Sequence, residues 1–412
     1  MRPLRTPIAA GVLAFAACAC MPGGASPAAT TTATGLYSVS YRSAPALAAA
    51  VRAEHGTVAR TVPALHVAEV RLPGTAAASL RRLPGIGSVE ASVERSAAAA
   101  PTPAVATTLT GFEWQLQATQ ESAVPLPVLQ AAAGVRIAVI DTGADLGAPA
   151  LAQARPLAFD VTTRSGRIGD PNGHGTFVAS LAAGALGSGG DAQLLVVKAG
   201  EADGAFTDVD EAAGIVYAVE HGARILNLSF AGTSTSPTER RAIRFAVHRG
   251  ALVIAPVGNE FASGDPVEYP AALLQPVGSN GAGGSGLAVA ASTSAGGRAP
   301  FSNTGSTVSL AAPGVDVLGA LSQLSSPAHY PRAPIDSAGA LYGFGSGTSF
   351  AAPQVAGAAA LVWAADPALT AAQVALILKQ TASGGGTWTP ELGFGVIDIA
   401  AAVARSTAST GS

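Results

Sequence analysis

The chain has 412 residues, of which 49% are hydrophobic and 12% charged, and its formal net charge is −3. This length predicts two or three domains, and the low charge argues against a largely disordered chain. The near-neutral balance excludes the basic surface of a nucleic-acid-binding protein. The only two cysteines, Cys18 and Cys20, are too close together to form a disulfide scaffold or a cysteine-based zinc site.

The first 25 residues have the features of an export signal. Arg2 and Arg5 precede an apolar stretch over residues 8–20 that is too short to span a bilayer. Residues 1–25 therefore predict a signal peptide and a secreted, periplasmic or otherwise extracytoplasmic protein. Cys18 also resembles a lipoprotein attachment site, so cleavage with release and a lipid anchor at Cys18 stay open as alternatives. Only the lipid anchor would make the membrane a partner.

Residues 35–95 predict a small ferredoxin-like α+β domain. Periodicity and turn residues give the order β-α-β-β-α-β. The expected elements are a strand at 36–41, a helix at 45–55, strands at 58–62 and 65–72, a short helix at 76–83 and a strand at 88–93. The following residues, 96–110, are rich in Ala, Pro and Thr without periodicity, and predict a linker that is open to proteolysis.

Residues 111–405 predict a larger α/β domain. Apolar runs without alternation predict strands buried on both faces, at 135–140, 194–197, 225–228, 252–257 and 287–291. Helical patterns lie between and after them, at 177–183, 208–221, 238–249, 349–365 and 370–381. This alternation predicts a doubly wound, mostly parallel sheet flanked by helices, with functional residues at the carboxyl ends of the strands.

Three side chains in this domain could together carry out nucleophilic catalysis. Asp141 follows the first buried strand, His174 stands between glycines at the start of a helix, and Ser349 starts another helix. A serine nucleophile needs a base, and the base needs a carboxylate to orient it. Each residue alone is more often a helix cap or a loop residue, so the signal is their joint occurrence. Pro353 is expected in the first turn of the Ser349 helix.

With these motifs, residues 112–402 resemble the subtilisin-like serine peptidases of family S8, in which the triad has the same chain order. The resemblance implies a serine endopeptidase that hydrolyses polypeptides through an acyl-enzyme. Ser349 would be the nucleophile, His174 the general base and then acid, and Asp141 the orienting carboxylate. Asn259 matches the family's donor to the oxyanion. No cofactor is implied, and we expect a monomer.

The resemblance also implies where a polypeptide substrate binds. Residues 229–232 resemble the strand that pairs with the substrate, and residues 264–270 resemble the floor of the specificity pocket. The residues assigned to substrate binding are Ser229, Phe230, Ala231, Gly232 and Gly264. Asp265 and Glu268 in the floor segment are interpreted as solvated acids, with a preference for basic substrate residues as the alternative.

Two departures from the family pattern concern calcium and the rim of the cleft. Ala150 stands where many relatives have a calcium-ligating Asp, and residues 184–194 form a loop too short for the usual carbonyl ligands. Because calcium takes six to eight oxygens, we expect the tight family site to be missing, while another calcium site stays open. No metal ligand is assigned. Residues 322–342 look like an insertion that forms a rim loop.

Finally, the resemblance implies that residues 35–95 are a propeptide that assists folding and inhibits the enzyme until cleavage between residues 95 and 110. A docked propeptide can help as a folding template, because a sheet made of parallel strands far apart in the sequence is slow to nucleate. Residues 26–110 carry seven basic and four acidic residues, whereas residues 111–412 carry 14 and 22, so the charges are complementary. The alternatives are a catalytically silent peptide-binding protein of this fold and a hydrolase acting mainly on esters.

Overall fold

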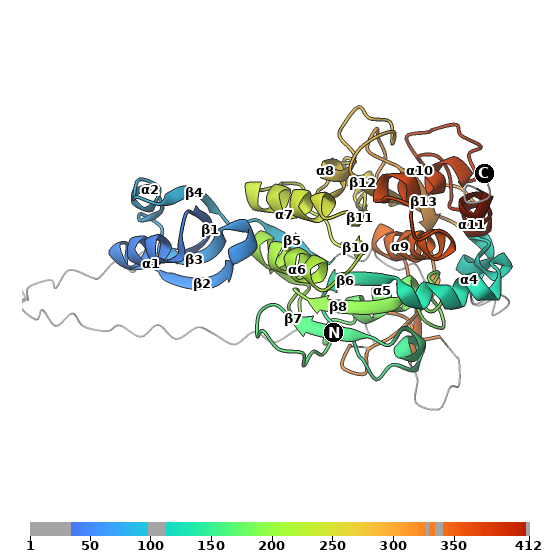
Figure 1. Cartoon of the computed structure of the whole chain (residues 1–412), viewed down its shortest axis with the longest axis horizontal. Coiled ribbons are helices and arrows are strands. Elements are labelled where there is room, and N and C mark those ends of the chain that lie inside the picture. The colour runs from blue at the N-terminus through green and yellow to red at the C-terminus, as the bar shows by residue number, and fades with distance from the viewer. Residues whose placement is uncertain (1–33, 98–112, 327–328, 334–340, 409–412) are drawn as a thin grey trace, which may run out of the picture.

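A computed structural model describes residues 34–97, 113–326, 329–333 and 341–408. The predicted signal peptide and nearly all of the predicted linker lie outside the described residues. Figure 1 shows a small N-terminal part beside a larger part that contains the central sheet.

The small part is a four-stranded antiparallel sheet with two helices. The strand order is β2-β3-β1-β4. The elements are β1 (Thr34–Tyr41), α1 (Ala44–Ala53), β2 (Thr57–Val62), β3 (Val67–Pro73), α2 (Ala77–Leu80) and β4 (Ile86–Ala91). Val39 and Val70 of the sheet pack with Leu47 of α1 and Leu80 of α2 in a small core of their own. The element order matches the prediction, because turn residues and period-two alternation marked each strand.

The larger part contains a seven-stranded sheet in which all neighbours are parallel, in the order β13-β12-β11-β10-β6-β8-β7. The strands are β6 (Arg136–Asp141), β7 (Leu157–Asp160), β8 (Gln193–Lys198), β10 (Ile225–Asn227), β11 (Leu252–Pro256), β12 (Gly286–Ser292) and β13 (Leu310–Pro313). The five predicted strands are present. The two edge strands, β7 and β13, were not predicted, because unlike the other five they contain no β-branched residue.

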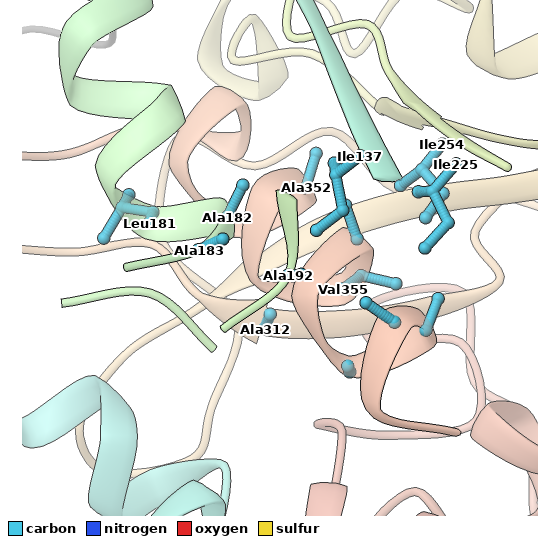
Figure 2. Close-up of a cluster of buried hydrophobic side chains, with 14 of the residues drawn as sticks. Ile137, Leu181, Ala182, Ala183, Ala192, Ile225, Ile254, Ala312, Ala352 and Val355 are labelled. Carbon is cyan, nitrogen blue, oxygen red and sulfur yellow. The ribbon is translucent and has the colours of Figure 1, made fainter. Parts of the chain in front are cut away.

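Helices cover both faces of this sheet, which makes the fold α/β and doubly wound, as predicted. On one face lie α5 (His174–Ala182), α9 (Thr348–Ala365), α10 (Ala371–Thr381) and α11 (Ile399–Ala408), and on the other lie α6 (Asp208–Glu220), α7 (Pro237–His248) and α8 (Ala271–Leu274). Ile137 belongs to the first core, and its neighbour Ala138 to the second, because successive side chains point to opposite faces. Figure 2 shows Ala352 and Val355 of α9 next to Ile137, Ile225 and Ile254 of the sheet.

Short elements complete the described chain. They are β5 (Glu94–Ser96), α3 (Trp114–Ala118), α4 (Leu126–Ala131), β9 (Ala205–Thr207), β14 (Val317–Ala320) and β15 (Tyr342–Gly345), together with the 3-10 helices η1 (Pro63–Leu65), η2 (Glu121–Ala123), η3 (Ala132–Gly134), η4 (Pro149–Ala154) and η5 (Phe261–Ser263). Strands β14 and β15 pair with each other, and β5 pairs with β9. Within the described residues, no helix is both long enough and apolar enough to cross a membrane.

The small part rests on α6 and α7 of the larger part (Figure 1). Val62 and Val67 pack against Val209 and Val216 of α6. Two polar contacts flank these valines: Arg60 forms an ion pair with Asp210, and the Ser38 and Thr238 hydroxyls are 2.6 Å apart. The interface therefore combines an apolar centre with polar contacts at its edge.

Candidate active site

Asp141 and His174 meet at the carboxyl end of the central strand β6. His174 is the first residue of α5, and its Nδ1 lies 2.8 Å from Oδ1 of Asp141. The same Asp141 oxygen accepts a hydrogen bond from the Thr142 amide at 2.7 Å. Both side chains are buried, and Nε2 of His174 makes no hydrogen bond within the described chain. Nδ1 of His174 is thus bound to a carboxylate, whereas Nε2 has no hydrogen-bond partner among the described residues.

Asp170 connects the two loops that carry Asp141 and His174. Its carboxylate accepts hydrogen bonds from the Thr142 hydroxyl at 2.8 Å and the Gly173 amide at 2.9 Å. It also accepts from the amide and the hydroxyl of Thr176, at 2.7 and 2.6 Å. Asp170 is fully buried. Sequence reasoning missed it, and the available signal was an acid four residues before the Gly-flanked histidine.

Ser349 is the second residue of α9, which packs against α5. The next residue, Phe350, has its ring centroid 5.5 Å from that of His174. Ser349 is therefore held close to the Asp141–His174 pair by the packing of two helices whose N-termini point to the same edge of the sheet.

The predicted position of Pro353 was wrong. Pro353 lies inside α9, beyond the first turn, where it lacks the N–H that would bond to the carbonyl of Ser349. That carbonyl instead accepts a hydrogen bond from the Ser229 hydroxyl at 2.8 Å, and Ser229 in turn accepts from the Asn227 side chain at 2.8 Å. Because Pro353 has no N–H, the Ser349 carbonyl can accept from Ser229, and this hydrogen bond links the start of α9 to the chain after β10.

Asn259 follows β11 and is also fixed to the N-terminus of α9. Its Oδ1 accepts hydrogen bonds from the amide and the hydroxyl of Thr348, at 2.9 and 3.0 Å. With the amide oxygen held there, the NH2 group of the side chain points away from Thr348. The structure thus places the predicted Asn259 beside Thr348, the residue before Ser349.

The chain's own residues 94–97 lie against the predicted substrate wall, between β9 and Ala231, and we call the place that they occupy the cleft. β5 pairs antiparallel with β9, and Ser96 pairs with Ala231 on the other side, where the Ala231 amide donates to the Ser96 carbonyl at 3.3 Å. Phe230 is buried against Phe206 of β9, and Gly232 pairs with Tyr269. A strand of the chain itself, residues 94–96, thus lies between β9 and the segment predicted to pair with substrate.

The floor segment differs from the expectation in one residue. Gly264 lies on the exposed turn after η5, and Asp265 binds Thr304 through its carboxylate. Glu268 is only 6% exposed, so interpreting it as a solvated acid was wrong. Burial raises the pKa of Glu268 to about 8, helped by a hydrogen bond to Glu260 and by the charge of Glu260. A neutral Glu268 does not attract basic side chains.

The described residues of the 322–342 segment lie over the loop before His174. Tyr330 is buried, with its ring centroid 5.2 Å from that of Phe177 in α5. His329 Nδ1 lies 3.1 Å from the carbonyl oxygen of Asn172. Burial raises the pKa of Tyr330, and the charges of Asp141 and Asp170 raise it further. This part of the predicted rim loop therefore contacts the chain next to the candidate site.

A buried acidic pair near the cleft was also missed. Glu211 on α6 and Glu239 on α7 both form ion pairs with Arg95 of β5. In the sequence these two acids look like ordinary first-turn residues that favour a helix dipole. Only the packing of α6 on α7 brings them together.

The fold and these side chains define a serine hydrolase built on a doubly wound parallel sheet. Comparison with known proteins identifies the family: residues 132–395 match the subtilase family of S8 peptidases. Subtilisin BL from Lederbergia lenta is 35% identical over 275 residues, which are 65% of this chain and 90% of that protein. The thermophilic serine proteinase of Bacillus sp. strain AK1 is 32% identical over 63% of this chain and 60% of its own length. The chain belongs to the subtilase family and is a serine endopeptidase.

Solved structures support the same fold. Fervidolysin from Fervidobacterium pennivorans, a keratinolytic enzyme, superposes with a TM-score of 0.73 over 92% of this chain and 62% of its own, at 23% identity. The epidermin leader peptide processing serine protease from Staphylococcus aureus superposes with a TM-score of 0.69 over 90% and 98% of the two chains, at 18% identity.

Proposed function

We propose that Ser349, His174 and Asp141 form the catalytic triad of an exported endopeptidase made as a self-processed precursor. The observation that carries the proposal is the 2.8 Å contact between His174 Nδ1 and Asp141 Oδ1, beside the helix that begins at Thr348 and contains Ser349. Asp141 orients the imidazole and stabilises its charged form. That leaves Nε2 of His174 to exchange protons with the serine.

The chemistry then follows in two steps. Ser349 Oγ attacks the substrate carbonyl carbon while its proton moves to His174 Nε2, and His174 returns this proton to the amine as the C–N bond breaks. Water hydrolyses the resulting acyl-enzyme by the reverse proton transfers. Asn259, through its NH2 group, and the amide of Ser349 donate to the oxyanion, aided by the N-terminus of α9. Loss of the corresponding side chain in subtilisin lowers kcat about 10²–10³-fold.

Residues 35–95 act in this proposal as the inhibitory propeptide. Their docking on α6 and α7, with residues 94–97 in the cleft, supports this role, because a bound strand excludes substrate. Cleavage between residues 95 and 110 would release an enzyme acting on polypeptides, and the export signal at 1–25 would place it outside the cytoplasm. We propose no step through calcium, because position 150 has a buried alanine side chain with no oxygen ligand.

Ser349→Ala tests the catalytic assignment. We expect casein hydrolysis to fall about 10⁶-fold, as it does when subtilisin loses its nucleophile, and the precursor to remain uncleaved. A serine-directed phosphonate should label the wild type and not the variant. The measurements are the hydrolysis rate, the mass of the secreted protein and the mass of the labelled protein.

Ser294→Ala, at an exposed serine away from the site, is the matched control and should mature and hydrolyse like the wild type. Undiminished hydrolysis by the Ser349 variant would overturn the assignment. A folded wild type that is never labelled would support the catalytically silent alternative. The mass of the N-terminal fragment also separates a lipidated Cys18 from a released protein.

A further inference from the structure

The side chain of Arg95 is buried in an acidic pocket at the edge of the cleft. Arg95 is 1% exposed, and its Nη2 lies 2.8 Å from Oε1 of Glu239, while its Nε lies 3.4 Å from Oε2 of Glu211. Its Nη1 donates to the carbonyl of Glu94 at 3.1 Å. The guanidinium thus reaches each of the two carboxylates with a different nitrogen.

The larger part of the chain supplies all the acids of this pocket. Glu211 and Glu239 are completely buried, and Asp208 at the start of α6 lies beside them. Neither oxygen of Glu211 accepts a hydrogen bond within the described residues, whereas Oε2 of Glu239 accepts from the Thr235 hydroxyl at 2.5 Å. Burial raises the pKa of Glu211 well above its usual range, the charge of Glu239 raises it further, and Arg95 lowers it. The charge of Arg95 thus opposes burial and the repulsion between two close acids, both of which favour their neutral forms.

The pocket belongs to the strand-binding site of the cleft. The backbone of residues 94–96 pairs with β9, the Ala97 amide donates to the Gly204 carbonyl at 3.0 Å, and Ser96 pairs antiparallel with Ala231. These contacts use backbone groups, which any extended polypeptide offers equally. The side-chain pocket around Arg95 is thus the part of the site that can distinguish one strand from another.

The antiparallel register relates this pocket to the nucleophile. Ser96 lies opposite Ala231, so the residue two positions after Ser96 in a strand of the same register falls opposite Ser229. Ser229 is hydrogen-bonded to the backbone of Ser349. Because Ser229 ties this end of the strand-binding site to Ser349, we assign the scissile carbonyl to the residue opposite Ser229. The residue at the position of Arg95 is then P4, the fourth residue before the scissile bond.

We propose that the Glu211–Glu239 pocket selects substrates with an arginine at P4. Once residues 34–97 leave the cleft, the pocket keeps both carboxylates and loses its cation, so a substrate arginine in the same register restores the ion pairs. A neutral side chain leaves two close acids unpaired, and an acidic one adds repulsion. Lysine fits less well, because its single ammonium nitrogen cannot face Glu211 and Glu239 with two different nitrogens, as the guanidinium of Arg95 does. This inference rests on the proposed function.

Internally quenched peptides with the sequence of residues 93–102 test the proposal on the processed wild-type enzyme. One peptide keeps arginine at the position of Arg95, and the others carry lysine, glutamine or glutamate there. We expect kcat/KM to fall in the order Arg, Lys, Gln, Glu, with arginine at least about tenfold above glutamine. Mass spectrometry should place the cleavage between the residues that correspond to 98 and 99.

Glu211→Gln and Glu239→Gln then test the residues. In each variant, kcat/KM for the arginine peptide divided by kcat/KM for the glutamine peptide should fall towards one. The concentration of active enzyme is determined by titration with the phosphonate. Glu220→Gln, at an exposed acid on the same helix α6, should keep the wild-type ratio. If the pocket variants fail to mature, the wild-type peptide series still decides the question.

Equal cleavage of the arginine and glutamine peptides would overturn the proposal and show that the pocket only locks residues 34–97 in place. A preference that survives in both pocket variants would also overturn it. Failure of the proposed function has a different signature: no peptide is cleaved and the phosphonate does not label Ser349.

Discussion

At the scale of single residues, burial decides what the acids near the cleft do. Asp265 and Glu268 are three residues apart in one loop, yet Asp265 binds Thr304 while Glu268 is buried and hydrogen-bonded to Glu260. A Cβ on Gly258 would lie 2.4 Å from Oε2 of Glu268, so a glycine with φ +106° is needed to let the carboxyl in. Glu268 is therefore a packed group, and its ionisation affects stability.

Glu268→Gln tests this conclusion. The pKa of Glu268 is raised to about 8, so the folded protein keeps the carboxyl neutral while the unfolded chain ionises near the ordinary value of 4.5. The free energy of unfolding therefore falls as the pH rises from about 4.5 to about 8, and stays lowered above that. Glutamine is never ionised, so we expect the variant to melt about 2–4 °C higher than its parent at pH 9 and at nearly the same temperature at pH 4, below the unfolded pKa.

Thermal denaturation should be measured in the Ser349→Ala background to prevent self-digestion. Glu220→Gln, at an exposed position, should show no such change with pH. An equal shift of the Glu268 variant at both pH values would contradict the raised pKa.

At the scale of elements, the site depends on how loops join the ends of strands and helices. The loop after β6 carries Asp141 and Thr142, and the loop before α5 carries Asp170 and Gly173. Asp170 lies in the second loop and accepts from the Thr142 hydroxyl of the first loop, while its other three hydrogen bonds come from Gly173 and Thr176 at the start of α5. The Asp141–His174 distance therefore depends on a residue outside the pair. Asp170 is thus a positioning residue.

Asp170→Asn should lower kcat by about 10- to 100-fold. The NH2 group of the asparagine cannot accept from the amides and hydroxyls that bind Asp170, so the two loops lose hydrogen bonds and move apart. We expect KM to change little, since Asp170 makes no contact with the strand in the cleft. The pH profile of kcat should shift as the His174–Asp141 contact loosens. Kinetics over pH 5–10 with titrated enzyme check this. Asp145→Asn, at a less buried acid that accepts from Gly147, is the control. An unchanged kcat in a folded Asp170 variant would contradict the role.

At the scale of the whole molecule, the small part docks through charges as well as apolar contacts. Its basic Arg60 meets Asp210, and Arg95 meets Glu211 and Glu239, in line with the opposite net charges of the two segments. Charge complementarity steers association and weakens with salt. The docked state should therefore be salt-sensitive.

Arg60→Glu places an acid against Asp210 and should weaken docking by about tenfold. The test uses the Ser349→Ala chain, cut in the linker by a trace of mature wild-type enzyme, and follows release of the N-terminal fragment by size-exclusion chromatography at 50 and 500 mM salt. The Arg60 variant should release the fragment at the lower salt, whereas Arg52→Glu, at an exposed site on α1, should behave like the parent. Equal elution of both variants would contradict electrostatic docking.

The local sequence alone determined the order of elements and the residues of the candidate triad. Continuous apolar runs marked the five central strands, and Gly-flanked motifs placed Asp141, His174 and Ser349 at element ends, because these features depend on neighbouring residues. The family resemblance added Asn259. Edge strands β7 and β13 contain no β-branched residue and left no such pattern.

Tertiary structure decided which distant residues meet. Glu211 and Glu239 sit in the first turns of separate helices, and Arg95 comes from the small part, so only packing makes them one pocket. The same holds for Asp170, whose four donors come from the loop after β6 and from the start of α5. It also holds for Ser229, whose hydroxyl reaches the carbonyl that Pro353 leaves without a helical partner. A sequence pattern records local periodicity, whereas burial and pairing of charges depend on how whole elements pack against one another.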